Sequence, residues 1–375
     1  MEYNYESLKN TYASFEHPAL KVTVEGRDMS EHAPQFVIGE ARIELTSGCE
    51  ASQAVWRIYG CVDEKDGSYL FEEMKPYILL GSYVSLEIGY GENLTEVFRG
   101  FIARVRFEAE EEDIPCAEVT AVDAKGALMS GRYSRQLRAG TYGEAVKELV
   151  NGEGYRELFK KGAAERIQVT DTPDKKENKE EVHLEQVSES DFTFIAGAAK
   201  RFGYEFFAET GTLVFRKARE GAKELLELGP GRGVISADIS YDIRGLAKEV
   251  EVRGMDDGKG EPFSAKRSSR KKLSYGALAD TVTGSAKQVY TDAAIRSKEE
   301  AGELAEALAD RQEWRFGTLQ CDCIGLPVLL PGNFVIISGY GKGADNQYYV
   351  TAASHILSGE EGYITRLEGY AASVL

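Results

Sequence analysis

The sequence predicts a mainly β protein in which two related antiparallel β-barrel domains flank a small α+β region. Two stretches, LLGSYVSLEIGYG (Leu79–Gly91) and LLPGNFVIISGYG (Leu329–Gly341), align without a gap and share their first two and last three residues. Each contains a short alternating strand that leads into a glycine-rich turn. The region between them carries helix-capping signals instead, so an unrelated middle separates the repeated parts.

The strands that follow the two stretches also resemble each other. Val119–Asp123 reads VTAVD, and Ile364–Glu368 reads ITRLE. An internal duplication predicts that the two stretches occupy equivalent strand and hairpin positions in two related domains. The alternative is chance similarity in a chain that is rich in glycine and tyrosine.

Composition limits the class of protein and its partners. The chain has 375 residues, a net charge of −17 and 42% hydrophobic residues, which suits a globular protein of several domains. An acidic surface repels nucleic acid backbones and anionic membranes, so we expect no stable nucleic acid binding. No apolar run reaches the length of a membrane span, and the acidic N-terminus lacks the basic start of a signal peptide.

The first part of the chain predicts short strands with one apolar face each. Residues 1–20 are expected to be an N-terminal arm, frayed or an edge strand, and residues 21–130 the first barrel domain. Alternation is clearest at Tyr83–Tyr90 and at Gly100–Glu108, where valine and phenylalanine oppose arginine and glutamate.

Residues 131–233 are predicted to form the α+β middle domain. Thr141 and Glu144 fit a capping box, and Ser190 is a good N-cap for a helix that Gly203 ends. Alternating residues on either side of Glu209-Thr210-Gly211 predict a hairpin. The polar segment 170–181 is expected to be a loop or a disordered segment.

Residues 234–375 are predicted to form the second barrel domain, with a loop at 256–290 and a helix at 298–314. Ser297 and Glu300 form the capping box that opens this helix. The basic run Lys266–Lys272 has two interpretations, a grip for phosphates or an acidic partner and a solvated loop. Strands near 317–323, 334–338, 348–354 and 363–369 complete the domain.

No pattern in the chain predicts catalysis, a metal site or a cofactor site. The histidines His17, His32, His183 and His355 are scattered, without an i, i+4 pair. Cys321 and Cys323 lie on one face of a predicted strand and are expected to be free, buried thiols. Gly339, Gly341 and Gly343 are read as a hairpin tip, because no helix follows to hold a pyrophosphate. We therefore predict no enzyme.

Taken together, these pieces resemble a known family. The middle region carries SDFTFI (190–195), GY (203–204) and GTLVF (211–215), and the last part carries GLP (325–327), PG (331–332), YVT (349–351) and GYIT (362–365). In this order and spacing the chain resembles the phage late control protein D family, the baseplate hub of contractile tails, and the hub portion of VgrG proteins, over residues 20–370.

The resemblance implies a structural baseplate hub. In that family a homotrimer with two tube-type barrels per subunit forms a pseudo-sixfold ring, an adaptor between the sixfold inner tail tube and the threefold spike. The expected partners are therefore a second and third copy of the chain, a spike protein, the inner tail tube protein and other baseplate proteins. The expected location is the bacterial cytoplasm during assembly, then a phage tail, a tailocin or another contractile injection particle.

One departure from the VgrG pattern shapes this expectation. The sequence stops at Leu375, before any oligonucleotide-binding-like barrel or β-helix needle, which predicts a spike on a separate polypeptide. Two alternative functions stay open, a glycan- or peptidoglycan-binding tail module and a tail-associated cell-wall hydrolase.

The ring model also predicts contact residues. The hairpin tips are the candidates for tube contact, since glycine permits tight turns and tyrosine offers amphipathic contact area. These residues are Gly89, Tyr90, Gly91, Gly339, Tyr340 and Gly341. Packing of both tyrosines on their own domains is the alternative. The ring lumen is expected to be lined mainly by acidic and small polar residues.

Overall fold

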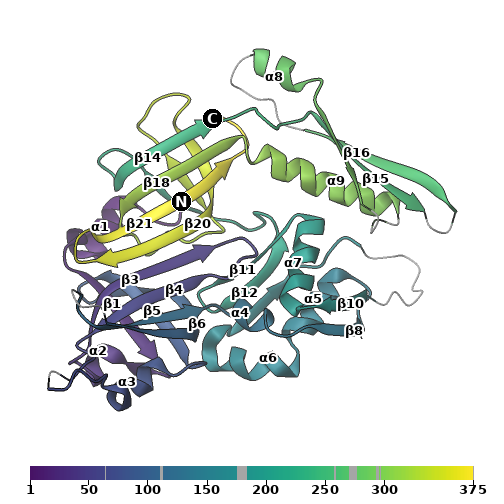
Figure 1. Ribbon diagram of the computed structural model, residues 1–375. Coiled ribbons are helices and arrows are strands. Elements are labelled where there is room, and N and C mark those ends of the chain that lie inside the picture. The colour runs from purple at the N-terminus through teal and green to yellow at the C-terminus, as the bar shows by residue number, and fades with distance from the viewer. Residues whose placement is uncertain are drawn as a thin grey trace.

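The computed structural model describes residues 1–63, 65–109, 113–174, 184–256, 259–269, 277–292, 295 and 297–374. It is mainly β, as predicted, with antiparallel pairing dominant. Figure 1 shows one long stack of strands from both ends of the sequence, with two α+β units attached on one side.

Strands from the N-terminal third build the first half of the stack. They pair in the order β3-β4-β7-β6-β5-β1, all antiparallel. Their bounds are β1 (Pro18–Val24), β3 (Val37–Thr46), β4 (Gln53–Tyr59), β5 (Tyr83–Tyr90), β6 (Asn93–Glu108) and β7 (Cys116–Val122), with the short β2 (Arg27–Asp28) beside β1. The short α2 (Met29–His32) and α3 (Phe71–Ile78) connect these strands.

Strands from the C-terminal part build the second half. They pair in the order β14-β18-β21-β20-β19-β13. Their bounds are β13 (Glu224–Leu228), β14 (Val234–Tyr241), β18 (Gly317–Ile324), β19 (Phe334–Ile337), β20 (Asn346–Ser358) and β21 (Gly362–Ala371). The half therefore starts with β13, before the expected domain start at residue 234.

The two halves have the same strand order. In chain order, β1, β3, β4, β5, β6 and β7 correspond to β13, β14, β18, β19, β20 and β21. The bulges correspond as well: Gly39 in β3 matches Ile235 in β14, and Ala103 in β6 matches Thr351 in β20. Bulges are specific features that disrupt the pairing ladder, so their coincidence supports a duplication. The sixth strand is the exception, since β1 runs antiparallel to β5 and β13 runs parallel to β19.

The predicted pair of barrels is not what the described residues form. β20 pairs antiparallel with β3 and joins the two halves into one 13-stranded sheet, and the described strands form no closed barrel. Each half curves over a shared apolar core that includes Trp56, Phe98 and Tyr348. The sequence predicted short strands correctly, but pairing partners depend on long-range contacts that periodicity does not report.

The equivalent strands β5 and β19 contain the two stretches that aligned in sequence, but their register is one residue away from the ungapped alignment. Val84 and Leu86 correspond to Val335 and Ile337, and all four side chains are fully buried. The ungapped alignment pairs Val84 with Phe334 instead, which places them on opposite faces. The VTAVD and ITRLE segments are not equivalent either, because Thr120 corresponds to Glu368.

The middle region contains both helices and strands. Its helices are α4 (Lys125–Leu128), α5 (Tyr142–Val150), α6 (Glu153–Leu158) and α7 (Asp191–Phe202), and its strands are β8 (Tyr133–Leu137), β9 (Arg166–Val169), β10 (Leu184–Glu189), β11 (Tyr204–Glu209) and β12 (Thr212–Lys217). Thr141 and Ser190 cap α5 and α7 through their side-chain oxygens, and Gly203 ends α7 in the left-handed conformation. In the first cap, Glu144 accepts from the Gly140 N–H, one residue before the position a capping box predicts.

A second α+β unit lies between β14 and β18, where a loop at 256–290 was expected. β15 (Glu249–Asp256), β16 (Glu261–Ser268) and β17 (Lys287–Thr291) form a small sheet, and α9 (Lys298–Glu313) packs on it. The expectation of a loop is wrong for these strands. Glycine and basic residues obscured the alternation of β16, which has few apolar residues. Short α8 (Ala277–Thr283) also lies here, whereas Arg270–Lys272 of the basic run and most of the polar loop 170–181 lie outside the described residues.

The N-terminal arm is packed on the sheet rather than frayed. α1 (Tyr5–Thr11) buries Leu8, and the backbone N–H groups of Glu2 and Tyr3 donate to the carbonyls of Glu224 and Leu225 in β13. The N-terminus of the chain therefore extends the second half of the sheet.

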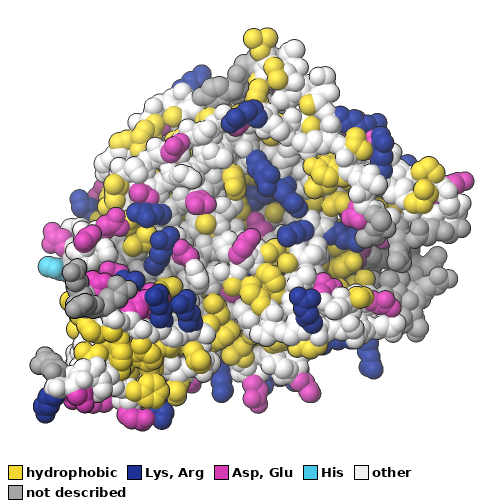
Figure 2. Space-filling model, in the orientation of Figure 1, with side chains coloured by type: hydrophobic (Ala, Val, Ile, Leu, Met, Phe, Trp, Pro, Cys, Tyr) yellow, Lys and Arg dark blue, Asp and Glu magenta, His cyan; other side chains and the backbone are white. Residues whose placement is uncertain are grey.

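The described surface mixes charges of both signs. Figure 2 shows acidic and basic side chains interspersed, with hydrophobic side chains gathered over α2 and α3. Phe71, Leu79 and Leu80 are among the exposed apolar residues of that region. Among the described residues, no helix is both long and apolar enough to cross a membrane.

Candidate assembly edges

The join between the two halves shows how this fold pairs one sheet with another. Ala352 to Leu357 of β20 face Thr46 to Ala41 of β3, in antiparallel register. Apolar side chains from both strands are buried at the join, including Ile43 and Ala353, each 0% exposed. This join hides two strand edges whose backbone groups would otherwise be open to any other strand.

His355 lies inside this join. Its ring is fully buried, and Nδ1 lies 2.9 Å from the Tyr363 hydroxyl and 3.2 Å from the Thr365 hydroxyl. Burial lowers the pKa of His355 to about 4, because the charged imidazolium loses its hydration. The ring is therefore neutral at pH 7, and its full burial makes it part of the core of the join.

The equivalent edge of the first half is open. Residues 101–108 of β6 pair with β7 on one side, as β20 pairs with β21, but on the other side no described strand continues past β5. Arg104 and Arg106 are exposed, Val105 is half-buried, and Phe107 is 41% exposed although it points to the core face. The Tyr69 hydroxyl donates to the Glu108 carbonyl at 2.8 Å, which satisfies the end of this edge.

The equivalent of β3 is open as well. β14 pairs only with β18 within the part of the chain that the structure describes, and Figure 1 shows it at one end of the stack of strands. Ile235 is 60% exposed, and Ile239 and Tyr241 are half-buried. Among the described strands, the equivalents of both strands of the internal join, β6 and β14, thus have an open edge.

The polar face of the first half carries alternating charges across its strands. Glu40, Arg57, Glu118 and Arg106 are cross-strand neighbours on β3, β4, β7 and β6. Arg57 lies 3.4 Å from both Glu40 and Glu118. Such exposed pairs add little stability, but they keep a wide sheet face hydrated and soluble.

The two predicted contact tips differ in position. Gly89 and Tyr90 lie within β5, and the Tyr90 ring is 2% exposed, packed against Phe15 and Tyr363. Its hydroxyl donates to the Gly325 carbonyl at 2.9 Å. A side chain on Gly89 would collide with the Asn93 carbonyl, so this glycine is needed by the tight hairpin that Gly91 turns. An exposed tip at Tyr90 is therefore wrong.

Tyr340 lies where an exposed tip was expected. β19 ends at Ile337, so Gly339, Tyr340 and Gly341 lie in the connection to β20, and Tyr340 is 43% exposed. The Asp345 carboxylate accepts from the N–H groups of Tyr340 and Gly341 at 2.8 and 3.0 Å. Both glycines have positive φ, 93° and 99°, which L side chains rarely adopt. The loop is ordered by its own backbone and presents the tyrosine outward.

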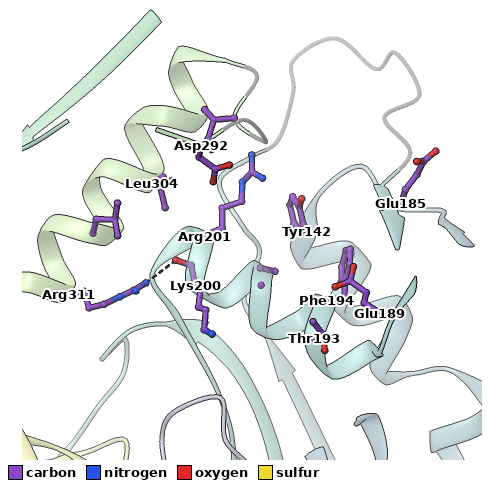
Figure 3. A pocket seen from close by; sticks show the side chains of 14 residues that line it. Tyr142, Glu185, Glu189, Thr193, Phe194, Lys200, Arg201, Asp292, Leu304 and Arg311 are labelled. Atoms are coloured by element: carbon purple, nitrogen blue, oxygen red, sulfur yellow. Dashed lines mark hydrogen bonds between the residues drawn. The ribbon is translucent and has the colours of Figure 1, made fainter. Parts of the chain in front are cut away.

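A cleft of about 400 Å³ separates the middle unit from the second α+β unit. Figure 3 shows α7 and α9 on its two sides, with the Arg311 guanidinium donating to the Lys200 carbonyl, a contact of 3.1 Å. Tyr142 and Arg201 also line it, with the guanidinium 5.4 Å from the tyrosine ring. Aromatic and charged groups in one cleft suit a polar ligand with an apolar face.

Among the described residues, side chains of His, Cys, Asp and Glu could hold a metal ion only where several of them come together. No group of three or more His, Cys, Asp or Glu side chains there is arranged to hold a metal ion. Cys321 and Cys323 are buried free thiols, as expected, and burial raises the pKa of Cys321 to about 12. A thiol with this pKa is protonated and unreactive at pH 7.

Solved structures with a similar fold include tail proteins and a component of a type VI secretion system. A tail protein from Neisseria meningitidis MC58 matches with a TM-score of 0.65 and 15% identity, covering 95% of this chain and 97% of that one. The 43 kDa tail protein of prophage MuSo2 from Shewanella oneidensis matches with a TM-score of 0.67 and 12% identity, covering 94% and 98%. An E. coli component of the type VI secretion system, itself similar to two T4 bacteriophage tail proteins, matches with a TM-score of 0.55 and 12% identity, covering 93% and 76%.

Sequence comparison gives a family. No curated protein matches the chain. The family model described as the Alg8 N-terminal domain matches residues 73–359, which is more than half of the sequence and includes β5, both α+β units and most of the second half of the sheet. The chain has the fold of phage tail proteins and belongs to the Alg8 N-terminal domain family.

Proposed function

We propose that this chain is the baseplate hub of a contractile tail-like particle, in which three copies form a ring between a sixfold tube and a threefold spike. The observation that carries this proposal is the duplicated sheet, with one strand order and matching bulges in both halves. Three chains with two equivalent sheet halves each present six similar units to a sixfold tube. A closed ring needs one repeated interface between copies.

The polar face of the sheet suits the wall of a channel. Across it, acidic residues alternate with arginine, as in Glu40, Arg57 and Glu118. If this face lines the lumen, the wall has mixed charge rather than the mainly acidic lining expected from net charge alone. Mixed charge keeps water at the wall and gives little attraction to passing cargo of either sign.

Tube contact is proposed for the connection between β19 and β20. Tyr340 is exposed there, and the Asp345 carboxylate holds the loop that presents it. A tyrosine ring on a fixed loop offers contact area at low entropy cost. The other proposed partners are the spike and further baseplate proteins.

Mass in solution tests the hub directly. Light scattering on the full chain, alone and mixed with a candidate spike and a tail tube protein, is expected to give a trimer in at least one of these samples. A monomer in every sample would overturn the proposal. Tube protein is expected to polymerise faster on the trimer than without it, and an unchanged lag time would remove the adaptor role.

A second candidate is glycan binding by the cleft between α7 and α9. Tyr142 and Arg201 line this cleft, and so do Glu185 and Glu189. Burial raises the pKa of Glu189, as is common for a carboxyl group in a binding or hydrolytic site. Pull-down with peptidoglycan tests binding, and zymography on the same preparation tests hydrolysis. Retention on peptidoglycan that Tyr142→Ala abolishes would favour this candidate.

A further inference from the structure

We propose that the open edge of β6 in one copy pairs with the open edge of β14 in the next copy, in the register that β20 and β3 use inside the chain. The inference rests on the proposed ring and names the joint that closes it. Its partner is a second copy of this chain, since the chain itself contains one complete example of the joint.

The matching bulges fix which residues are equivalent. Thr351 in β20 and Ala103 in β6 occupy equivalent bulges, so Ala352 corresponds to Arg104. Each later residue of β20 corresponds to the next residue of β6 in turn. Gly39 and Ile235 occupy the other bulge, so Glu40 corresponds to Ser236 and Ile43 to Ile239. These equivalences assign one register to a pairing of β6 with β14, namely the register of β20 with β3.

The transferred register places specific side chains opposite each other. Ala352 faces Thr46 and His355 faces Ile43 within the chain. In the same way, Arg104 is expected to face Asp242 of the next copy, and Phe107 its Ile239. Val105 then faces Tyr241.

This register is complementary on both faces of the sheet. On the core face, Val105 and Phe107 meet Tyr241 and Ile239, and all four are incompletely buried in the single chain. Apolar and aromatic pairs opposite each other stabilise antiparallel strands. A shift by one residue would put Phe107 opposite Asp238 or Ser240 and turn the apolar pairs to opposite faces.

On the polar face, Arg104 meets Asp242, whose carboxylate also accepts from Arg244 of its own copy at 2.6 to 3.0 Å. Glu108 meets Asp238, a like-charge pair, but Arg106 lies diagonally next to Asp238 and already contacts the Glu108 carboxylate at 2.7 Å. The arginine therefore lies between the two carboxylates. Charge complementarity and continuity with the internal join both select a second copy as the occupant.

Burial in the internal join shows what the joint should do to the free edges. Ala353 and His355 correspond to Val105 and Phe107, and both are 0% exposed because β3 covers them. Phe107 is 41% exposed in the single chain. We expect it to become buried in the assembled ring.

Disulfide trapping tests the register. Phe107→Cys and Ile239→Cys, placed in separate preparations and mixed under mild oxidation, are expected to give a linked dimer that neither variant forms alone. The double variant is expected to give a covalent trimer. Directly opposite residues lie within the Cα separation that a disulfide spans, roughly 4–7 Å.

The control moves one partner by one residue. Phe107→Cys with Asp238→Cys is expected to give at least tenfold less linked product, because the two side chains then point to opposite faces. Circular dichroism of each single variant, matching the parent chain, verifies that the substitutions leave the fold intact.

The outcomes separate the two proposals. A trimer by light scattering that links at 107 and 238, or at neither pair, would overturn this register and leave the hub standing. Absence of any oligomer with spike and tube present would overturn the hub and the joint together. Linking at 107 and 239 in a trimer supports both.

Discussion

The equivalent strands β20 and β6 have different neighbours along one edge. β20 is covered along its outer edge by β3, and its core-facing residues Ala353 and His355 are fully buried. On its other side β6 pairs with β7, the equivalent of β21, and it has the equivalent bulge, yet its edge is open and Phe107 is 41% exposed. The difference lies in the partner, because within the described residues β3 covers β20, whereas β14 does not pair with β6.

Among the described strands, β6 and β14 have open edges, and the pairing of β20 with β3 is an example of how such edges are covered in this fold. Exposed strands with apolar core-facing residues attract unwanted pairing unless a specific partner covers them. Glu40 on β3, next to the internal join, and Arg104 and Arg106 on the open edge of β6 keep the polar face hydrated in both cases.

Truncation of Tyr90 and of Tyr340 should change the free energy of unfolding by very different amounts. Tyr90→Ala removes a buried ring and its hydrogen bond to the Gly325 carbonyl, and is expected to cost about 3–5 kcal/mol of unfolding free energy. Tyr340→Ala removes an exposed ring and should stay within about 0.5 kcal/mol. Urea unfolding monitored by circular dichroism measures both, and equal losses would contradict the assignment of Tyr90 to the core.

Replacing the equivalent residues Ile43 and Ile239 should affect different properties, the stability of the chain in one case and its assembly in the other. Ile43→Ala opens a cavity in the internal join and is expected to cost about 2–5 kcal/mol. Ile239→Ala, at the matching position of an open edge, should cost about 1 kcal/mol or less in the monomer and weaken the trimer instead. Urea midpoints and light scattering on the same two variants distinguish these effects, and a stable trimer of Ile239→Ala would count against the joint.

The internal join should weaken in mild acid, whereas the open edges carry no buried histidine. The pKa of His355 is lowered by burial, so the folded state binds fewer protons than the unfolded state between pH 6.5 and about 4. The stabilisation from neutral His355 is fully present above pH 6.5 and is lost as pH falls towards 4, by about 2–3 kcal/mol.

Unfolding free energies at pH 7, 6, 5 and 4 measure this loss. His355→Gln serves as the control, because it removes the titrating group while keeping a polar side chain. The difference between the two proteins should shrink as pH falls. A constant difference across the range would show that His355 keeps an ordinary pKa.

Charge reversal at the open edge should change association alone. Arg104→Glu faces Asp242 of the next copy in the proposed register, and is expected to weaken association by about tenfold, or about 1.4 kcal/mol. If Asp242→Arg in the same chain restores association, the two residues face each other as the proposed register requires. Arg156→Glu on α6, an exposed arginine outside the edge, is the matched control. Equal weakening by both substitutions would point to net charge rather than to a specific pair.

Sequence patterns predicted much of the local structure. The caps at Thr141, Ser190 and Ser297 are formed, and Tyr83–Tyr90 is a strand with the predicted bounds. These features depend on residues a few positions apart, so they can be read along the chain. β16 was missed because its few apolar residues do not alternate over enough positions.

The contact residues show where sequence reasoning ends. Gly89-Tyr90-Gly91 and Gly339-Tyr340-Gly341 are identical tripeptides, yet one tyrosine is in the core and the other is exposed. β5 continues to Tyr90, while β19 ends three residues before Tyr340. Strand length depends on the neighbouring strands, and β1 pairs with β5 as far as Tyr90.

The mainly β class and the presence of repeated strands could be predicted from the order of residues, because periodicity and turn residues are local. Three features required the folded chain: the pairing of β20 with β3, the offset of one residue between the repeats and their ungapped alignment, and the open edges of β6 and β14 among the described strands. Strand pairing is made through backbone groups, which are the same in nearly every residue, so the side-chain sequence carries little record of which edges meet.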